Sequence, residues 1–157
     1  KQWNKGLVES VNRNDFPNVI FFEEKANNFV PALKAACSTG NRTILDYLLE
    51  LDPQLLSNNI IRCTYEAAVG GHSELVEFLL SQKFSQERLL SSAICGSARG
   101  GHIELLSKYT ERMGSSVSPY LNTQIVERAA RGGHKAIVEK HLPYHSYDAV
   151  VAAIRGG

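Results

Sequence analysis

Apolar residues recur along the chain in two stripes, each with the spacing of one helix face, on either side of a glycine. With the glycine as position zero, small or apolar residues stand eight, seven, four and three positions before it. Around Gly71 these are Cys63, Thr64, Ala67 and Ala68. Larger apolar residues follow four, five and nine positions after it, at Leu75, Val76 and Leu80. Because residues three and four apart share a helix face, the pattern predicts two helices joined by a short turn.

The pattern repeats at a nearly constant interval. Its most recognisable copies are GGHSELV, GGHIELL and GGHKAIV, and TGNRTIL is a fourth. The second glycines are Gly71, Gly101 and Gly133, with Gly40 in the equivalent place, so the interval is 30 to 32 residues. A constant interval of this length indicates a repeat protein, in which each helical pair completes its core by stacking on its neighbours.

The glycine and the residue after it have distinct expected roles in the turn. A helix that ends in a left-handed residue favours glycine there, because other side chains clash in that conformation. The next residue is Asn41, His72, His102 or His134, polar types that suit the start of the second helix. Each unit is therefore predicted to be a helix, a tight turn and an antiparallel helix.

Two further units are predicted at the ends of the chain. At the N-terminal end Asn14 takes the place of the glycine and a helix follows from Pro17 to Lys25, while at the C-terminal end a helix precedes Gly157. Segments 52–58, 82–86 and 113–119 are rich in polar and turn-forming residues and are predicted to be loops. We expect one all-α domain of five to six units over residues 1–157. Because no initiating Met is present, we expect it to be part of a longer protein.

Composition agrees with a folded domain and narrows the classes of function. With 43% hydrophobic and 21% charged residues the chain can build a core, and its formal charge of +1 favours neither nucleic acid nor a membrane surface as a partner. Cys37, Cys63 and Cys95 lie far apart and are expected to be free, buried thiols in a reducing compartment, the cytoplasm. No apolar run approaches the roughly 20 residues of a membrane span, and no signal peptide is recognisable.

The spacing of reactive residues indicates no metal or catalytic site. His72, His102 and His134 occupy equivalent positions, so stacked repeats hold them about 10 Å apart, too far to share a metal ion. His141 and His145 are four residues apart, but a proline between them interrupts the helix that would align them. No nucleophile–base pair, paired carboxylates or phosphate-binding loop is recognisable. We therefore expect a protein that is not an enzyme and uses no cofactor, metal or small-molecule substrate.

These repeats resemble the ankyrin repeat. The matching residues are Ala67, Ala68, Gly71, His72, Glu74, Leu75, Val76, Leu79 and Leu80, and the later units keep most of them. The ankyrin signature Thr-Pro-Leu-His is absent, and the intervals are shorter than the family's 33 residues. The resemblance thus implies a degenerate ankyrin-like solenoid whose β-hairpin loops are short or absent. By the same resemblance, such arrays are frequent in effectors of intracellular bacteria and in large DNA viruses, which implies a host cytosol.

The resemblance also implies where a partner binds, because ankyrin proteins commonly use variable residues of the first helices and the inter-repeat loops. The residues expected to contact a partner are Tyr65, Glu66, Val69, Arg99, Arg128, Arg131 and Arg155. Arg99, Arg131 and Arg155 recur two positions before the turn glycine, so that stacking places them in a basic row with Arg128 beside it.

The expected function is recognition of another protein, or of another domain of the same chain, as a scaffold module. Arginine forms bidentate hydrogen bonds with carboxylates and phosphates, so an acidic partner suits the basic row. Three alternatives stay open at this point. The first is binding of nucleic acid or phosphoinositides by the same arginines, with nucleic acid less favoured. The second is a regulatory role inside a multidomain enzyme or effector. The third is that the basic face is ordinary solvated surface.

Overall fold

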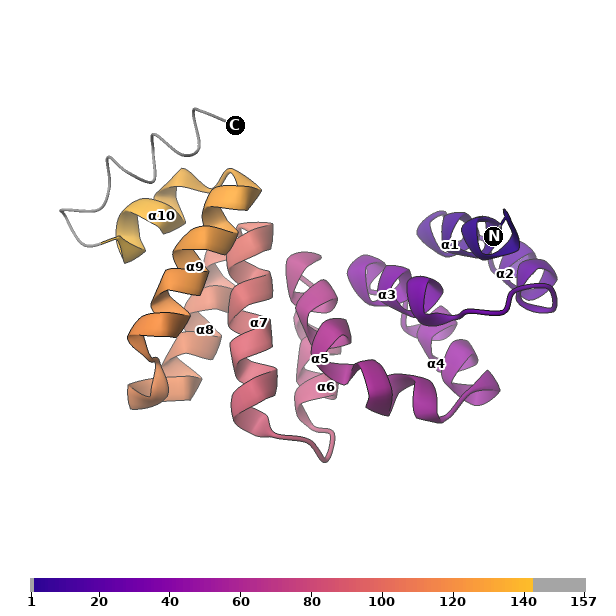
Figure 1. Ribbon diagram of the computed structural model, residues 1–157, viewed down its shortest axis with the longest axis horizontal. Helices are drawn as coiled ribbons and strands as arrows, with labels where there is room; N and C mark the ends of the chain where they lie inside the picture. Colours follow the sequence, from indigo (N-terminus) through magenta and orange to yellow (C-terminus); the bar gives the residue numbers. More distant parts are fainter. Residues whose placement is uncertain (1, 143–157) are drawn as a thin grey trace.

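The protein is helical throughout the part of the chain that the structure describes. The computed structural model describes residues 2–142, which form ten α-helices, one 3-10 helix and no β-strand (Figure 1). The helices are α1 (Gln2–Asn12), α2 (Phe16–Glu23), α3 (Val30–Thr39), α4 (Arg42–Leu51), α5 (Gln54–Val69), α6 (Ser73–Leu80), α7 (Gln86–Gly100), α8 (Ile103–Met113), η1 (Gly114–Ser116), α9 (Pro119–Gly132) and α10 (Lys135–His141). The all-α prediction is confirmed.

The helices form pairs, and the pairs stack in the order of the sequence. Each odd-numbered α-helix packs against the even-numbered helix that follows it. The odd-numbered helices also pack on one another, α1 on α3, α3 on α5, α5 on α7 and α7 on α9. Figure 1 shows α5, α7 and α9 next to one another, with α6 and α8 behind them. We call the outward side of α5, α7 and α9 the first-helix face.

Small side chains of the first helices fill the interior of the stack. Four positions before each turn glycine the side chain is fully buried; these residues are Ala36, Ala67, Ser97 and Ala129. Larger buried residues of the second helices cover this layer; they include Ile44, Leu45, Leu75, Val76, Leu106, Ile137 and Val138. In α8 the predicted Leu105 and Thr110 are only partly buried, and Tyr109 takes the core position. The three cysteines are free and buried, as predicted.

Each first helix ends in the left-handed conformation predicted for the turn glycine. The φ angle is 68° at Gly40, 78° at Gly71 and 79° at both Gly101 and Gly133. Among the described residues, Asn14 is the only other type with positive φ, at 55°. Asparagine tolerates this region better than most residues, so Asn14 marks the turn of the first unit, as predicted.

Several predicted boundaries were wrong. Residues 54–58 were predicted to be loop, but α5 begins at Gln54, because the Asp52 side chain accepts a hydrogen bond from the Gln54 N–H at 3.0 Å and the next residue, Leu55, is buried. The 113–119 segment contains the 3-10 helix, and the second helix of the first unit begins and ends earlier than predicted, at Phe16 and Glu23. The unit predicted before Gly157 lies outside the described residues.

None of the helices within residues 2–142 combines the length and the apolar character that crossing a membrane requires.

Candidate binding groove on the first-helix face

The histidines of the GGH copies join neighbouring units. In each case Nε2 lies within hydrogen-bond distance of a carbonyl oxygen in the preceding unit: His72 with Ser38 at 2.9 Å, His102 with Val69 at 2.9 Å, and His134 with Arg99 at 3.0 Å. Because a carbonyl oxygen only accepts, Nε2 carries the hydrogen and donates it. Each of the three histidines is the N-cap residue of its helix, as predicted, but none of their side chains makes a capping hydrogen bond. Each ring reaches back to the preceding unit instead.

The first glycine of each GGH copy, and the second glycine wherever a described unit follows it, make room for this contact. A Cβ added to Gly100, a first glycine, would lie 2.3 Å from the Val69 carbonyl oxygen that His102 binds. A Cβ added to Gly71, a second glycine, would lie 2.7 Å from the His102 ring of the next unit. GGH is therefore a contact motif between repeats, in which the glycines admit the histidine.

The described residues contain no group of three or more His, Cys, Asp or Glu side chains placed to hold a metal ion. His141 is engaged with α9 instead. Its Nδ1 lies 3.0 Å from Asn122 Oδ1, and Asn122 Nδ2 donates to the His141 carbonyl oxygen at 2.9 Å. His145, considered with His141 as a possible metal pair, lies outside the described residues.

A groove on the first-helix face arises because α7 carries small residues where its neighbours carry large ones. Nine, six and five positions before its turn glycine, α7 has Ser92, Cys95 and Gly96. At the same positions α5 has Arg62, Tyr65 and Glu66, and α9 has Gln124, Glu127 and Arg128. Gly96 also lets α7 approach α5 closely, since an added Cβ would lie 2.4 Å from the Tyr65 carbonyl oxygen. The middle helix is therefore the floor of the groove and its neighbours are the walls.

The groove consists of two adjoining hollows. Four residues line both hollows; they are Ile61, Tyr65, Ser92 and Arg128. The first hollow, of about 350 Å³, is completed by Ser57, Asn58, Asn59, Ile60, Arg62 and Phe84. The second, of about 580 Å³, is completed by Glu87, Arg88, Ser91, Cys95, Ser116, Ser118, Tyr120, Leu121 and Gln124. Together they offer an elongated surface of mixed aromatic and polar character across three units.

Arg128 lies where the two hollows meet. Its guanidinium carbon is 5.7 Å from the centroid of the Tyr65 ring, so the contact joins α9 to α5, the two helices that flank α7. The Nε atom of Arg128 is buried and has no hydrogen-bond partner. A buried donor without an acceptor costs free energy. Arg128 therefore lines both hollows with a guanidinium whose Nε has no acceptor among the described residues.

Cys95 on the groove floor is a protonated thiol. Burial raises its pKa, although the positive charge of Arg128 opposes the rise. Its Sγ lies 3.7 Å from Gln124 Oε1, within reach of a weak hydrogen bond. A raised pKa makes the thiolate scarce at neutral pH, so Cys95 contributes surface to the groove and no activated nucleophile.

The residues predicted for partner contact lie in different settings. Tyr65 and Arg128 line the groove and contact each other. Glu66 forms an ion pair with Arg62 on the same helix, with 2.7 Å between Glu66 Oε1 and Arg62 Nε. Of the residues predicted for partner contact, the structure thus brings together Tyr65 of α5 and Arg128 of α9.

The other predicted residues do not line the groove. Val69 and Arg99 supply the backbone carbonyls that the histidines bind. Arg131 forms a 2.9 Å ion pair with Glu127 on its own helix. Arg155 lies outside the described residues. The predicted basic row is therefore partly neutralised where it is described.

Sequence reasoning missed the residues that shape the groove. It considered positions two and five before the turn glycine, whereas position nine supplies Arg62, Ser92 and Gln124. The signal was present in the sequence, because Ser92, Cys95 and Gly96 give α7 smaller side chains than either flanking unit at all three positions. Arg88 and Tyr120, nearer the helix starts, had no such signal.

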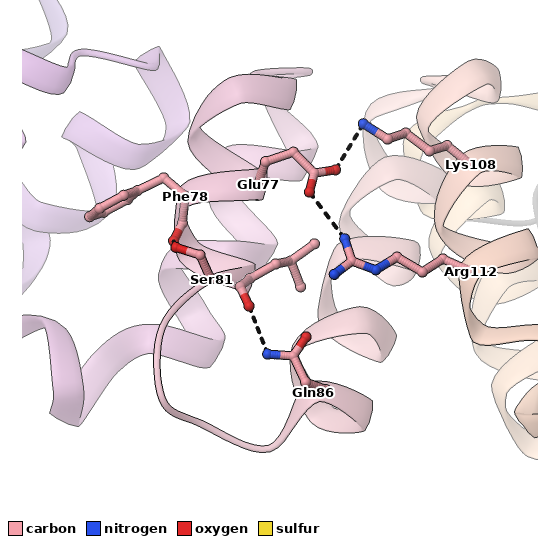
Figure 2. A network of polar contacts seen from close by, with 7 residues as sticks. Glu77, Phe78, Ser81, Gln86, Lys108 and Arg112 are labelled. Atoms are coloured by element: carbon pink, nitrogen blue, oxygen red, sulfur yellow. Dashed lines mark hydrogen bonds and ion pairs between the residues drawn. The ribbon is translucent and has the colours of Figure 1, made fainter.

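A second charged cluster lies on the second helices. Figure 2 shows Glu77 of α6 pointing toward Lys108 and Arg112 of α8, with contacts of 2.8 Å and 3.0 Å. Partial burial raises the pKa of Glu77. Lys108 and Arg112 lower it by a larger amount, so the net shift is downward. Burial and the nearby Glu77 carboxylate raise the pKa of Tyr109. The cluster therefore joins α6 to α8, and the Glu77 carboxylate is paired with both cations.

Comparisons of the chain with protein-family models, with curated proteins and with solved structures found no match.

Proposed function

We propose that the chain is a degenerate ankyrin-like repeat domain that binds an extended segment of another protein, or of another domain of the same chain, in the groove of the first-helix face. The GGH contacts and the repeated left-handed glycines support the ankyrin-like assignment. The function is one of recognition, because the groove residues offer shape and hydrogen bonds but no activated nucleophile or acid–base pair among the described residues.

The observation that carries this proposal is the groove itself, with Arg128 at its centre. Its hollows of about 350 and 580 Å³ adjoin at four shared residues, which makes one continuous surface across α5, α7 and α9. Asn58 offers a side-chain amide to the backbone groups of an extended peptide, whereas the amides of Asn59 and Gln124 already donate to the Leu55 carbonyl oxygen and to the Tyr120 hydroxyl. Tyr65, Phe84 and Tyr120 offer apolar area, and aromatic residues are enriched in protein interfaces.

Nucleic acid and phosphoinositides are less well supported as partners. Binding to polyanions requires several cations that can contact phosphates. Arg62 and Arg131 are engaged by Glu66 and Glu127 through contacts of 2.7 and 2.9 Å, which leaves a discontinuous basic surface.

A groove-filling variant tests the proposal. Ser92→Trp places a large side chain on the groove floor, at a position where the flanking units carry Arg62 and Gln124. The change also removes the 2.7 Å hydrogen bond from Ser92 Oγ to the Ile61 carbonyl oxygen, so a circular dichroism melt first verifies that the variant folds. Peptides are first selected on the wild-type protein from a displayed library of random 12-residue sequences. Their affinities are then measured by fluorescence anisotropy.

We expect the selected peptides to lose at least tenfold in affinity for Ser92→Trp. The matched control is Thr123→Trp, which adds the same side chain at an exposed position of α9 outside the groove and should leave affinity unchanged. Equal binding to wild type and Ser92→Trp, or failure to select any peptide, would overturn the proposal.

A further inference from the structure

We propose that the groove selects a partner segment with an aspartate or glutamate at its centre, whose carboxylate binds the Arg128 guanidinium. This inference rests on the proposed function and specifies the chemistry of the partner. It follows from the state of Arg128, from the other charges of the groove and from what lies on either side of this arginine.

The guanidinium of Arg128 is held ready for an acceptor. The Tyr65 ring, 5.7 Å away on α5, contacts it across α7 and restricts its positions. Its Nε is buried without a hydrogen-bond partner. A planar guanidinium presents paired N–H groups whose spacing matches the two oxygens of a carboxylate. A carboxylate approaching along the groove can therefore form paired hydrogen bonds with this guanidinium.

The charges around Arg128 favour a single negative charge over two. Arg62, the nearest alternative cation on α5, is already paired with Glu66 at 2.7 Å. Arg88 is turned toward Phe84, with its guanidinium carbon 5.6 Å from that ring. Glu87 and Arg88 both line the hollow that Arg128 lines, so their opposite charges offset each other and the charge of Arg128 is left unbalanced. A carboxylate carries one charge, whereas a phosphorylated side chain carries nearly two at neutral pH, so the groove suits the carboxylate better.

Both sides of Arg128 offer apolar area to the residues next to the acidic one. Phe84 borders the first hollow and is 36% exposed, while Tyr120 borders the second and is 72% exposed. Because each ring borders a hollow that Arg128 also lines, residues on either side of the carboxylate can contact them. The segment inferred is therefore an acidic residue flanked on both sides by apolar or aromatic residues.

The test uses peptide pools and charge-neutral variants of the whole chain. Four pools of peptides share random flanks and have a fixed central residue, which is Glu, Gln, phosphoserine or Lys. Each pool is titrated against wild type, Arg128→Gln, Arg128→Lys and the control Arg131→Gln. Arg131 lies three residues further along α9, outside the groove, so its variant loses the same charge at nearly the same place. Circular dichroism melts verify that each variant folds.

We expect wild type to bind the Glu pool at least tenfold more tightly than the Gln pool. Arg128→Gln should abolish this preference, and Arg131→Gln should retain it. Arg128→Lys keeps the charge but loses the paired N–H groups, and we expect it to retain only part of the preference. If Arg128→Gln fails to fold, Arg128→Lys alone decides, because an unchanged Glu preference in that variant would contradict the guanidinium contact.

Three outcomes would overturn the inference. Equal binding of the Glu and Gln pools, with binding still lost in Ser92→Trp, would retain the groove as the binding site and reject the carboxylate. Tighter binding of the phosphoserine pool would assign the groove to phosphorylated segments instead. A Glu preference that persists in Arg128→Gln would place the recognising cation elsewhere.

Discussion

The Nε2 atom of His102 lies 2.9 Å from the carbonyl oxygen of Val69, 33 residues earlier in the chain. The contact joins the start of one second helix to the end of the preceding first helix. His72 and His134 make the same contact one unit before and one unit after. Three identical bonds thus bind the stack together along its turn side, and each can be removed singly.

Replacement of His102 by phenylalanine should destabilise the protein. The ring volume is largely kept, but the Val69 carbonyl loses its donor, and an unsatisfied buried acceptor costs about 1–3 kcal/mol. The free energy of unfolding, measured by urea denaturation, should fall by an amount in this range. Ile103→Ala, at the neighbouring exposed residue, is the control and should have a smaller effect. An unchanged urea midpoint for His102→Phe would show that the bond does not stabilise the stack.

Alanine at two turn glycines should separate backbone strain from the contact with the next unit. Gly71 and Gly133 have nearly equal φ angles of 78° and 79°. At Gly71 the added Cβ meets the His102 ring at 2.7 Å, whereas at Gly133 no described atom lies within 4 Å. Gly133→Ala should cost about 1–2 kcal/mol for the left-handed conformation, and Gly71→Ala should cost more. Equal losses in urea denaturation would contradict a contact role for the second glycine.

The ion pairs of Glu77 should contribute a small, salt-sensitive stability. Its side chain is 39% exposed and those of Lys108 and Arg112 are 51% and 46% exposed, so solvent screening limits the gain from each pair to at most about 1 kcal/mol. Glu77→Gln should lower the urea midpoint at low salt, and the difference should shrink in 1 M sodium chloride. Because the pKa of Glu77 is lowered on folding, this contribution is present above the unfolded value of 4.5 and is lost as pH falls below it.

Glu111→Gln is the control for this prediction, because it removes an exposed carboxylate from α8. It should show neither the low-salt loss nor its salt dependence. A Glu77→Gln difference that stayed constant from low to high salt would indicate a packing effect in place of the ion pairs.

Mild acid should weaken the stack through His141. Burial, and to a lesser degree the charge of Lys140, lower the pKa of His141 below its usual 6.5. Just below pH 6.5 the unfolded chain therefore binds a proton that the folded chain excludes, so stability falls as pH decreases through this window. His141→Gln should reduce the loss in urea midpoint between pH 7.5 and pH 5. The same pH dependence in wild type and variant would rule out this residue as the source.

The helical organisation was predictable from local pattern, and the candidate site only in part. The turn glycines and Asn14 were assigned correctly because left-handed backbone geometry depends on a single residue. The start of α5 was misplaced because the Asp52 side chain caps it, a local contact that composition does not reveal. Tyr65 and Arg128 were both predicted to face a partner, but their contact was not, since it depends on how closely α5, α7 and α9 stack.

The sequence by itself determined the helices, the turns and the interval between units, because these follow from side-chain periodicity and backbone preference within about 30 residues. Only the tertiary structure decided what the repeated polar residues do. GGH became a contact between units because stacking brings a histidine against a carbonyl more than 30 residues away. Arg128 became the centre of a groove because stacking places small α7 residues between larger ones. Both depend on distances between units, which no single unit contains.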